Sequence, residues 1–200
     1  MLEIMSQIIS TAIYITEKYG KNQLYIAATT DMMTGIRNRA YFYDVLHSSF
    51  ITARETHHPF LVIMADMDGL KAINDTFGHR YGDAAIIEFT ERVKAALRNV
   101  DVFARLGGDE FGILINSVSG AKAAQQLIER LEHTLAQPFM FDEQLIPLSA
   151  SFGVGIYRQD VADITQLLDE ADKKMYANKK LKSSLSSNGI RLITLAWLLC

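Results

Sequence analysis

Apolar residues are grouped into runs along much of this chain, and two of the runs stand close together. Leu61 to Ala65 form a continuous apolar run after Pro59, as expected of a central buried strand. Val102 to Leu106 and Phe111 to Ile115 are separated by four residues that include two glycines. This second pattern predicts a β-hairpin.

Other stretches have the three- and four-residue spacing of amphipathic helices. One helix is predicted to begin at Asp83, which can cap it, and its inner face consists of Ile86, Phe89, Val93 and Leu97. Two more helices are predicted at Ala121 to Leu135 and at Asp163 to about Leu181.

The region between the last two helices reads as a strand. Leu145 to Tyr157 is rich in strand-forming residues and is expected to be broken by Pro147 and Gly153. Helices that alternate with mixed strand pairings indicate an α/β sandwich, with helices packed against one sheet.

The two ends of the chain differ from this central part. Residues 1–29 are expected to form a helix, whose single apolar stripe is made of Met5, Ile8, Ala12, Ile15 and Tyr19. It either packs on the following domain or forms a short coiled stalk that pairs two chains. Residues 30–182 are expected to form the compact domain, and residues 183–200 an atypical tail or closing strand.

Composition narrows the class of protein. The chain has 200 residues, of which 49% are hydrophobic, enough for one domain with a real core. A formal net charge of -3 argues against general nucleic-acid binding, which needs a basic surface, so any anionic ligand must be held locally. Cys200 is the only cysteine, which excludes a disulfide framework and a Cys-based zinc site.

No apolar run reaches the length of a membrane span, and the first residues lack the pattern of a signal peptide. We therefore expect a cytoplasmic chain. Ile190 to Cys200 is apolar apart from Arg191 and Thr194, but it is too short to cross a bilayer. It is a closing strand, a contact with a membrane surface or a partner, or an altered terminus.

The hairpin turn carries the residues that indicate chemistry. Arg105 to Phe111 read R-L-G-G-D-E-F, in which glycines allow a backbone to approach a phosphate and Asp109 and Glu110 offer hard oxygen ligands for Mg²⁺. Asp66 and Asp68 follow the buried strand, so the two acidic groups converge if the strands are neighbours.

Carboxylates that converge need a compensating charge. Two of them about 4 Å apart repel by roughly 4 kcal/mol at an effective dielectric near 20, which favours a bound cation. Divalent ions that bridge protein and triphosphate oxygens supply much of the catalysis in phosphoryl transfer. Each motif alone also fits a helix cap, a solvated loop or a plain hairpin connection.

The stretch between the two acidic groups adds groups suited to a nucleotide. Lys71 offers a cation for phosphate, and Asn74 and Asp83 offer side chains that match a purine edge. Guanine presents paired N1–H and N2–H donors to a carboxylate, a pattern that adenine lacks, so the sequence favours GTP over ATP.

Five blocks of the sequence together resemble, in order, the GGDEF domains of bacterial diguanylate cyclases. They are Asp31 to Arg39, Asp66 to Asp83, Gly107 to Phe111, Ser151 to Val154, and Ala171 to Lys179. The resemblance implies a nucleotidyl cyclase or polymerase palm-like fold, with a mainly antiparallel central sheet flanked by helices. It also implies condensation of two GTP into cyclic di-GMP with release of two pyrophosphates.

The resemblance implies roles for individual residues. It places the metal at Asp66, the main-chain carbonyl of Met67, Asp109 and Glu110, with two Mg²⁺ or Mn²⁺ ions expected per site and Asp109 as the base for the 3′-hydroxyl. It places the substrate at Asn74, Asp83, His79, Lys71, Gly107, Gly108 and Lys179.

Two further positions concern regulation and phosphate binding. Arg98 and Asp101 form an R-x-x-D at the spacing of the family's inhibitory product site, although such a pair is also common on helix surfaces. Ser183 stands where the family usually has an arginine that meets phosphate, and Lys180 or Lys182 is expected to replace it as a point charge.

The expected active unit is a homodimer, because one site holds one GTP whereas the product joins two. Two rival hypotheses remain. In the first, the chain is a catalytically silent receptor that binds cyclic di-GMP through Arg98 and Asp101. In the second, it is a GTP-binding regulator of a neighbouring protein. Both leave Asp66, Asp109 and Glu110 without a use.

Overall fold

The computed structural model describes residues 23–116 and 120–187 and contains a five-stranded sheet with the strand order β1-β3-β4-β2-β7. The four neighbouring pairs are antiparallel except for β1 and β3, which are parallel. The strands of this sheet are β1 (Arg37–Asn38), β2 (Phe60–Met67), β3 (Val102–Gly107), β4 (Glu110–Asn116) and β7 (Ala150–Ile156). A separate hairpin consists of β5 (Phe139–Phe141) and β6 (Gln144–Ile146).

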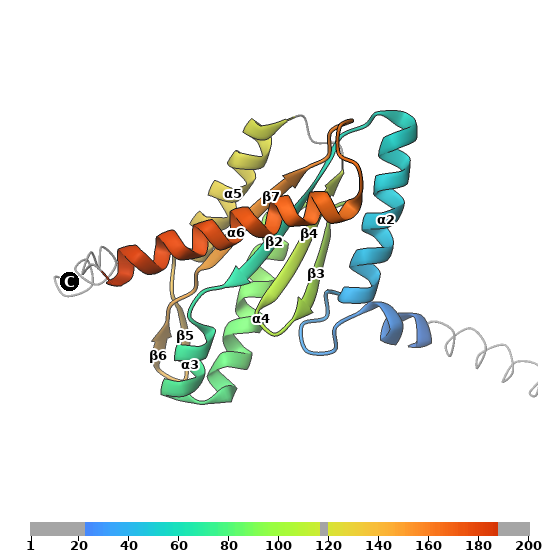
Figure 1. Cartoon of the computed structure of the whole chain (residues 1–200). Coiled ribbons are helices and arrows are strands. Elements are labelled where there is room, and N and C mark those ends of the chain that lie inside the picture. The colour runs from blue at the N-terminus through green and yellow to red at the C-terminus, as the bar shows by residue number, and fades with distance from the viewer. Residues whose placement is uncertain (1–22, 117–119, 188–200) are drawn as a thin grey trace, which may run out of the picture.

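Helices cover both faces of the large sheet (Figure 1). One face packs on α2 and α6, and the other on α3, α4 and α5. These helices are α2 (Arg39–Thr56), α3 (Leu70–Phe77), α4 (His79–Ala96), α5 (Ala121–Leu135) and α6 (Ile164–Ser187). The predicted α/β sandwich with a mainly antiparallel sheet is therefore confirmed.

The central strand β2 is buried along its whole length, because β4 and β7 pair with it on either side and helices cover both faces. The predicted hairpin is confirmed as β3 and β4, with residues 108–109 as its turn. The prediction that Gly153 breaks a strand is wrong. Gly153 lies inside β7, opposite Met64 of β2, and only Pro147 falls in a gap between strands.

The predicted start of one helix is also wrong. Helix α4 begins at His79 rather than at Asp83, and its buried face includes the expected Ile86, Phe89 and Val93. Gly78 adopts φ 93°, which ends α3 and lets α4 start with the next residue. A backbone turn at glycine, rather than an Asp side chain, therefore sets this boundary.

Close contact between backbones fixes the position of α6 on β7. A Cβ atom at Gly153 would lie 2.8 Å from the Cβ of Met175, and closer still to the Ala171 carbonyl oxygen. A Cβ at Gly155 would lie 3.1 Å from Leu167 Cδ1. The missing side chains on β7 thus let the α6 backbone rest directly on the sheet.

Glu170 fastens the first half of α6 to the strand. Its carboxylate accepts a 2.7 Å hydrogen bond from Lys174 and pairs at 3.4 Å with Arg158, which follows β7. Burial alone raises the pKa of Glu170, but the hydrogen bonds and charges of Lys174 and Arg158 outweigh burial and hold it below its ordinary value. Lys174 also donates to the Val154 carbonyl at 2.8 Å.

The ends of the chain are described in part. Residues 23–29 are helical, whereas residues 1–22, which carry the predicted apolar stripe, lie outside the described residues. Helix α6 continues to Ser187, past the expected domain boundary at residue 182. Ile190 to Cys200 lies outside the described residues. Among the helices that the structure describes, none is long and apolar enough to cross a membrane.

Candidate active site

Strand pairing brings the two acidic groups to one edge of the sheet. In the register of β2 and β4, Asp66 lies opposite Glu110. The next residue, Met67, donates its backbone N–H to the Asp109 carbonyl at 2.9 Å. The hairpin turn is therefore attached to the end of β2, and the carboxylates of Asp66, Asp109 and Glu110 share one small region.

A lysine from the far end of the chain completes this region. Lys179 on α6 donates a 2.6 Å hydrogen bond to Asp66 Oδ1, although the two residues are 113 positions apart. The side chain of Asp66 is 12% exposed and that of Lys179 is 40% exposed. Lys179 thus neutralises part of the charge of a nearly buried carboxylate.

The pKa values of Asp66 and Lys179 are shifted both by burial and by the charges of neighbouring carboxylates. Burial raises the pKa of Asp66 above its ordinary value despite the opposing effect of Lys179, and the charges of Asp109 and Asp68 act in the same direction as burial. Burial works to lower the pKa of Lys179, but Asp66, Asp109 and Asp68 outweigh it and raise the pKa. Three carboxylates therefore act on one ammonium group.

Asp68 is held by hydroxyl groups of the neighbouring segment. Its carboxylate accepts hydrogen bonds from Ser151 Oγ at 2.8 Å and from Ser149 Oγ at 3.1 Å. The two hydroxyl donors fix the orientation of this carboxylate. Asp68 is therefore part of the acidic group, although the resemblance assigned it no role.

Lys182 approaches the acidic group and Lys180 does not. Lys182 Nζ lies 3.8 Å from Asp68 and 3.2 Å from Glu132, and it donates to the Ala150 carbonyl at 2.6 Å. Lys180 Nζ instead lies 4.5 Å from the ring centroid of Tyr176. Of the two lysines proposed to replace the arginine missing at Ser183, Lys182 is the one beside the acidic residues.

An arginine stabilises the turn that contains the two glycines. Gly108 adopts φ 53°, a left-handed conformation that glycine accepts at no steric cost. The Gly108 carbonyl accepts hydrogen bonds from Arg105 Nε at 3.0 Å and Nη2 at 2.9 Å. The same guanidinium lies 3.5 Å from Asp31 Oδ1. Arg105 opens the sequence motif, and its fork-shaped side chain, which bonds to Gly108 and pairs with Asp31, gives it a structural role there.

Asp31 connects this turn to the segment that follows the first described helix. Burial acts to raise the pKa of Asp31, but hydrogen bonds from the Thr34 hydroxyl and backbone, together with Arg105, outweigh burial and lower it. The distances are 2.7 Å and 2.9 Å for the two Thr34 donors. The hairpin turn is thus linked through Arg105 and Asp31 to the turn at residues 31–36.

The residues expected to bind guanine lie on α3 and α4. Asn74 is in the last turn of α3, and Asp83 is an exposed residue of α4. Lys71 and His79 are exposed near the starts of α3 and α4. Helix α3 begins at Leu70, just after Asp68, so these residues follow directly from the acidic group along the chain.

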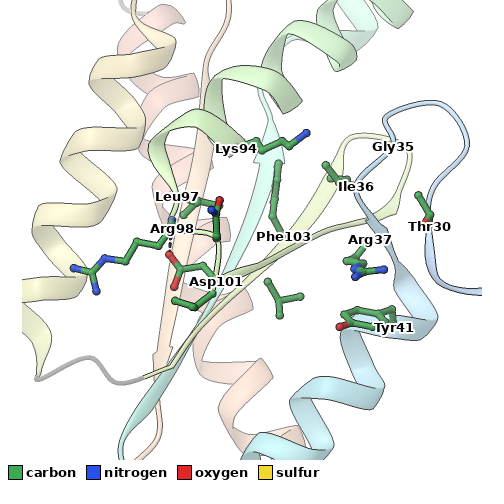
Figure 2. A pocket seen from close by; sticks show the side chains of 13 residues that line it. Thr30, Gly35, Ile36, Arg37, Tyr41, Lys94, Leu97, Arg98, Asp101 and Phe103 are labelled. Carbon is green, nitrogen blue, oxygen red and sulfur yellow. Dashed lines mark hydrogen bonds between the residues drawn. The ribbon is translucent and has the colours of Figure 1, made fainter. Parts of the chain in front are cut away.

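Arg98 and Asp101 line a separate pocket of about 540 Å³. Figure 2 shows them at one side of this pocket, with Arg37 and Tyr41 at the other. Asp101 Oδ2 accepts a 2.8 Å hydrogen bond from the backbone N–H of Arg98. Asp101 Oδ1 is buried, and among the described residues it has no hydrogen-bond partner.

The donor set near Asp66 fits a hard divalent cation. Within the described part of the chain, no three Asp, Glu, His or Cys side chains are grouped so that they could hold a metal by themselves. Mg²⁺ in phosphate chemistry is commonly held by one or two carboxylates together with substrate phosphates. Asp66 and Asp109, which interact electrostatically, can supply these carboxylates, and the Lys179 ammonium shows that a positive charge is favourable at Asp66.

These features define an α/β domain that gathers carboxylates and lysines at one sheet edge, an arrangement suited to nucleotide phosphates and metal ions. The sequence pattern of the family described as "Diguanylate cyclase, GGDEF domain" matches residues 28–184. The chain belongs to this family.

Relatives and solved structures agree with this assignment. The chain is 35% identical to the bifunctional diguanylate cyclase/cyclic di-GMP phosphodiesterase MucR of Pseudomonas aeruginosa, over 89% of the chain and 25% of that protein. It is 33% identical to diguanylate cyclase A of Treponema denticola, over 88% of the chain and 46% of that protein. The chain thus spans less than half the length of either relative.

Among solved structures, a sensory box/GGDEF family protein from Caulobacter crescentus is 33% identical, with a TM-score of 0.71 over 76% of this chain and 99% of that one. The coiled coil and GGDEF domain of DgcB from Caulobacter crescentus, in complex with c-di-GMP, has a TM-score of 0.80 over 87% of this chain and 92% of that one. At 23% identity, this second likeness concerns the fold alone.

Proposed function

We propose that this chain is a diguanylate cyclase domain that condenses two GTP into cyclic di-GMP and two pyrophosphates. The observation that carries the proposal is the meeting of Asp66, Asp109 and Lys179 at one sheet edge, where β2, the hairpin turn and α6 come together. Family membership and the names of its relatives support the same activity.

In this proposal the carboxylates of Asp66, Asp109 and Glu110 and the carbonyl of Met67 hold Mg²⁺ or Mn²⁺. The metal supplies charge neutralisation at the reacting phosphate when it is bound. Asp109 accepts the proton of the attacking 3′-hydroxyl. Lys179 binds the triphosphate, because its ammonium group is already directed at the acidic edge.

Other residues bind the guanine base and the triphosphate. Asn74 and Asp83 bind the guanine edge, and His79, the first residue of α4, takes part in binding the substrate. Lys71 supplies a second cation for the triphosphate. The backbone at Gly107 and Gly108 approaches the nucleotide, since both glycines are exposed and neither has a side chain that would block it.

The active unit in this proposal is a homodimer. Each chain positions one GTP, and the two reciprocal 3′–5′ bonds require two sites that face each other. The exposed apolar residues Leu24, Tyr25 and Ile26, at the start of the described chain, suit a contact that brings two chains together.

Product feedback is the second part of the proposal. Cyclic di-GMP binds at Arg98 and Asp101, where a guanidinium can fork onto a guanine edge or a phosphate. The unpartnered Oδ1 of Asp101 and the adjoining pocket support a ligand at this position.

The direct test is to incubate the purified chain with GTP and Mg²⁺ and to look for cyclic di-GMP by mass spectrometry. Asp109→Asn should abolish the product while the fold is retained, because the turn lies at the surface and the Met67 hydrogen bond uses the backbone of residue 109. A dimeric sample that makes no product but binds cyclic di-GMP tightly would replace the cyclase proposal with the receptor.

A further inference from the structure

Gly82 occupies a position where local preference favours another residue. It is the fourth residue of α4, is buried, and has no positive φ. Glycine is the least favourable residue in a helix interior apart from proline. Backbone conformation therefore gives no reason for glycine here, and the reason must lie in what approaches it.

The neighbour of Gly82 is the side chain of Asn74. A Cβ atom at residue 82 would lie 2.8 Å from Asn74 Cγ, 3.2 Å from Nδ2, and closer still to Oδ1. The two helices that carry these residues are joined at Gly78, whose N–H donates to the Asn74 carbonyl at 2.9 Å. The carboxamide of Asn74 thus rests against the backbone of α4, in space that any side chain would fill.

Asn74 also has an unused acceptor. Its Oδ1 atom is buried, and within the described residues it has no hydrogen-bond partner. Such an atom is unusual in a folded protein, and here the α4 backbone at Gly82 covers it. Asp83 follows Gly82 on α4, and its exposed carboxylate offers a second acceptor for a base.

We propose that Gly82 is a positioning residue for base recognition, which holds the Asn74 carboxamide in the orientation that selects guanine. The inference rests on the proposed function for its ligand. The end of an Asn side chain rotates more easily than a helix moves, so an added methyl group at residue 82 displaces the carboxamide and leaves α4 in place. Gly82→Ala therefore alters base selection with little change in the fold.

The test compares binding of 3′-deoxy-GTP and 3′-deoxy-ITP, which lack the attacking hydroxyl and are not condensed. Inosine lacks the 2-amino donor of guanine, so the ratio of the two dissociation constants measures recognition of that group. In wild type we expect a preference for the guanine nucleotide. Gly82→Ala should weaken 3′-deoxy-GTP binding about tenfold and change 3′-deoxy-ITP binding much less.

A double-mutant cycle with Asn74→Ala shows whether Gly82 acts through Asn74. In the Asn74→Ala background, Gly82→Ala should not weaken binding further. It should also raise the melting temperature by about 2 °C, because only the better helix propensity of alanine remains. In the wild-type background this gain should be absent.

Unchanged nucleotide selection in Gly82→Ala, or an equal loss of binding in both backgrounds, would overturn the inference. Wild-type protein that binds neither nucleotide would refute the proposed function and the role in base selection together. The melting temperatures would then still decide whether Gly82 and Asn74 are coupled in the fold.

Discussion

Replacing Gly153 by alanine should displace α6 from β7 while the rest of the fold stays in place. The new Cβ would lie 2.8 Å from Met175 Cβ, whereas carbon atoms in favourable contact are about 3.5 Å apart, so helix and strand must separate by at least about 0.7 Å. The main obstacles are backbone atoms of α6, which no change of rotamer can move aside.

Two consequences follow from this displacement. Overpacking of this kind costs about 1–3 kcal/mol of unfolding free energy, which outweighs the roughly 0.5–1 kcal/mol that alanine gains over glycine within a strand. Lys179 lies one helical turn after Met175, so its 2.6 Å contact with Asp66 lengthens as well. A misplacement of about 1 Å at a catalytic site can lower the rate up to roughly 100-fold.

The assay measures cyclic di-GMP formation and urea unfolding for the same samples. The matched control is Leu135→Ala, which removes a fully buried side chain from α5, on the opposite face of the sheet from α6, and should cost about 2–5 kcal/mol. We expect both variants to be less stable, and only Gly153→Ala to lose most of its activity under conditions where both are folded. Full activity in Gly153→Ala, or equal losses in both variants, would refute this reasoning.

Three further outcomes are expected. Lys182→Met should raise the KM for GTP roughly tenfold, about 1.4 kcal/mol, whereas Lys180→Met should leave KM nearly unchanged; equal effects would contradict the assignment. Arg98→Ala should preserve turnover and weaken inhibition by cyclic di-GMP, and unchanged inhibition would exclude this site. The stabilisation from the lowered pKa of Glu170 is present above about pH 4.3 and is lost as pH falls through the folded value. Glu170→Gln should therefore reduce the fall in unfolding free energy at acid pH, and an unchanged pH dependence would contradict the stabilising role of this ion pair.

Elements with a local cause could be predicted from the sequence. The buried strand β2, the hairpin of β3 and β4, and helix α5 each carry their pattern within a few residues, and all three are confirmed. Helix α2 was within reach too, since its buried residues Phe42, Leu46, Phe50 and Ala53 are spaced three and four apart. The boundary at His79 was missed because an Asp cap and a glycine turn are both common helix starts.

The candidate site depends more on tertiary contacts. Pairing of β2 with β4 was a condition of the prediction that the acidic groups converge, and strand order cannot be read from apolar spacing. The approach of Lys179 to Asp66 depends on how α6 crosses β7, and no local signal gives that crossing. The sequence does not show which of Lys182 and Lys180 replaces the missing arginine. Only the direction of each side chain in the structure distinguishes them.

Gly82 and Gly153 depart from local preference in the same way. Both lie inside regular elements without a positive φ, and both are poor choices for the local structure that contains them. In each case another element carrying a candidate site residue occupies the space of the missing side chain: α3 with Asn74, and α6 leading to Lys179. Because sequences depart from local preference chiefly where a function demands it, we infer that these two glycines set the positions of the residues proposed to bind base and phosphate. Alanine at either position therefore tests the site more specifically than it tests the fold.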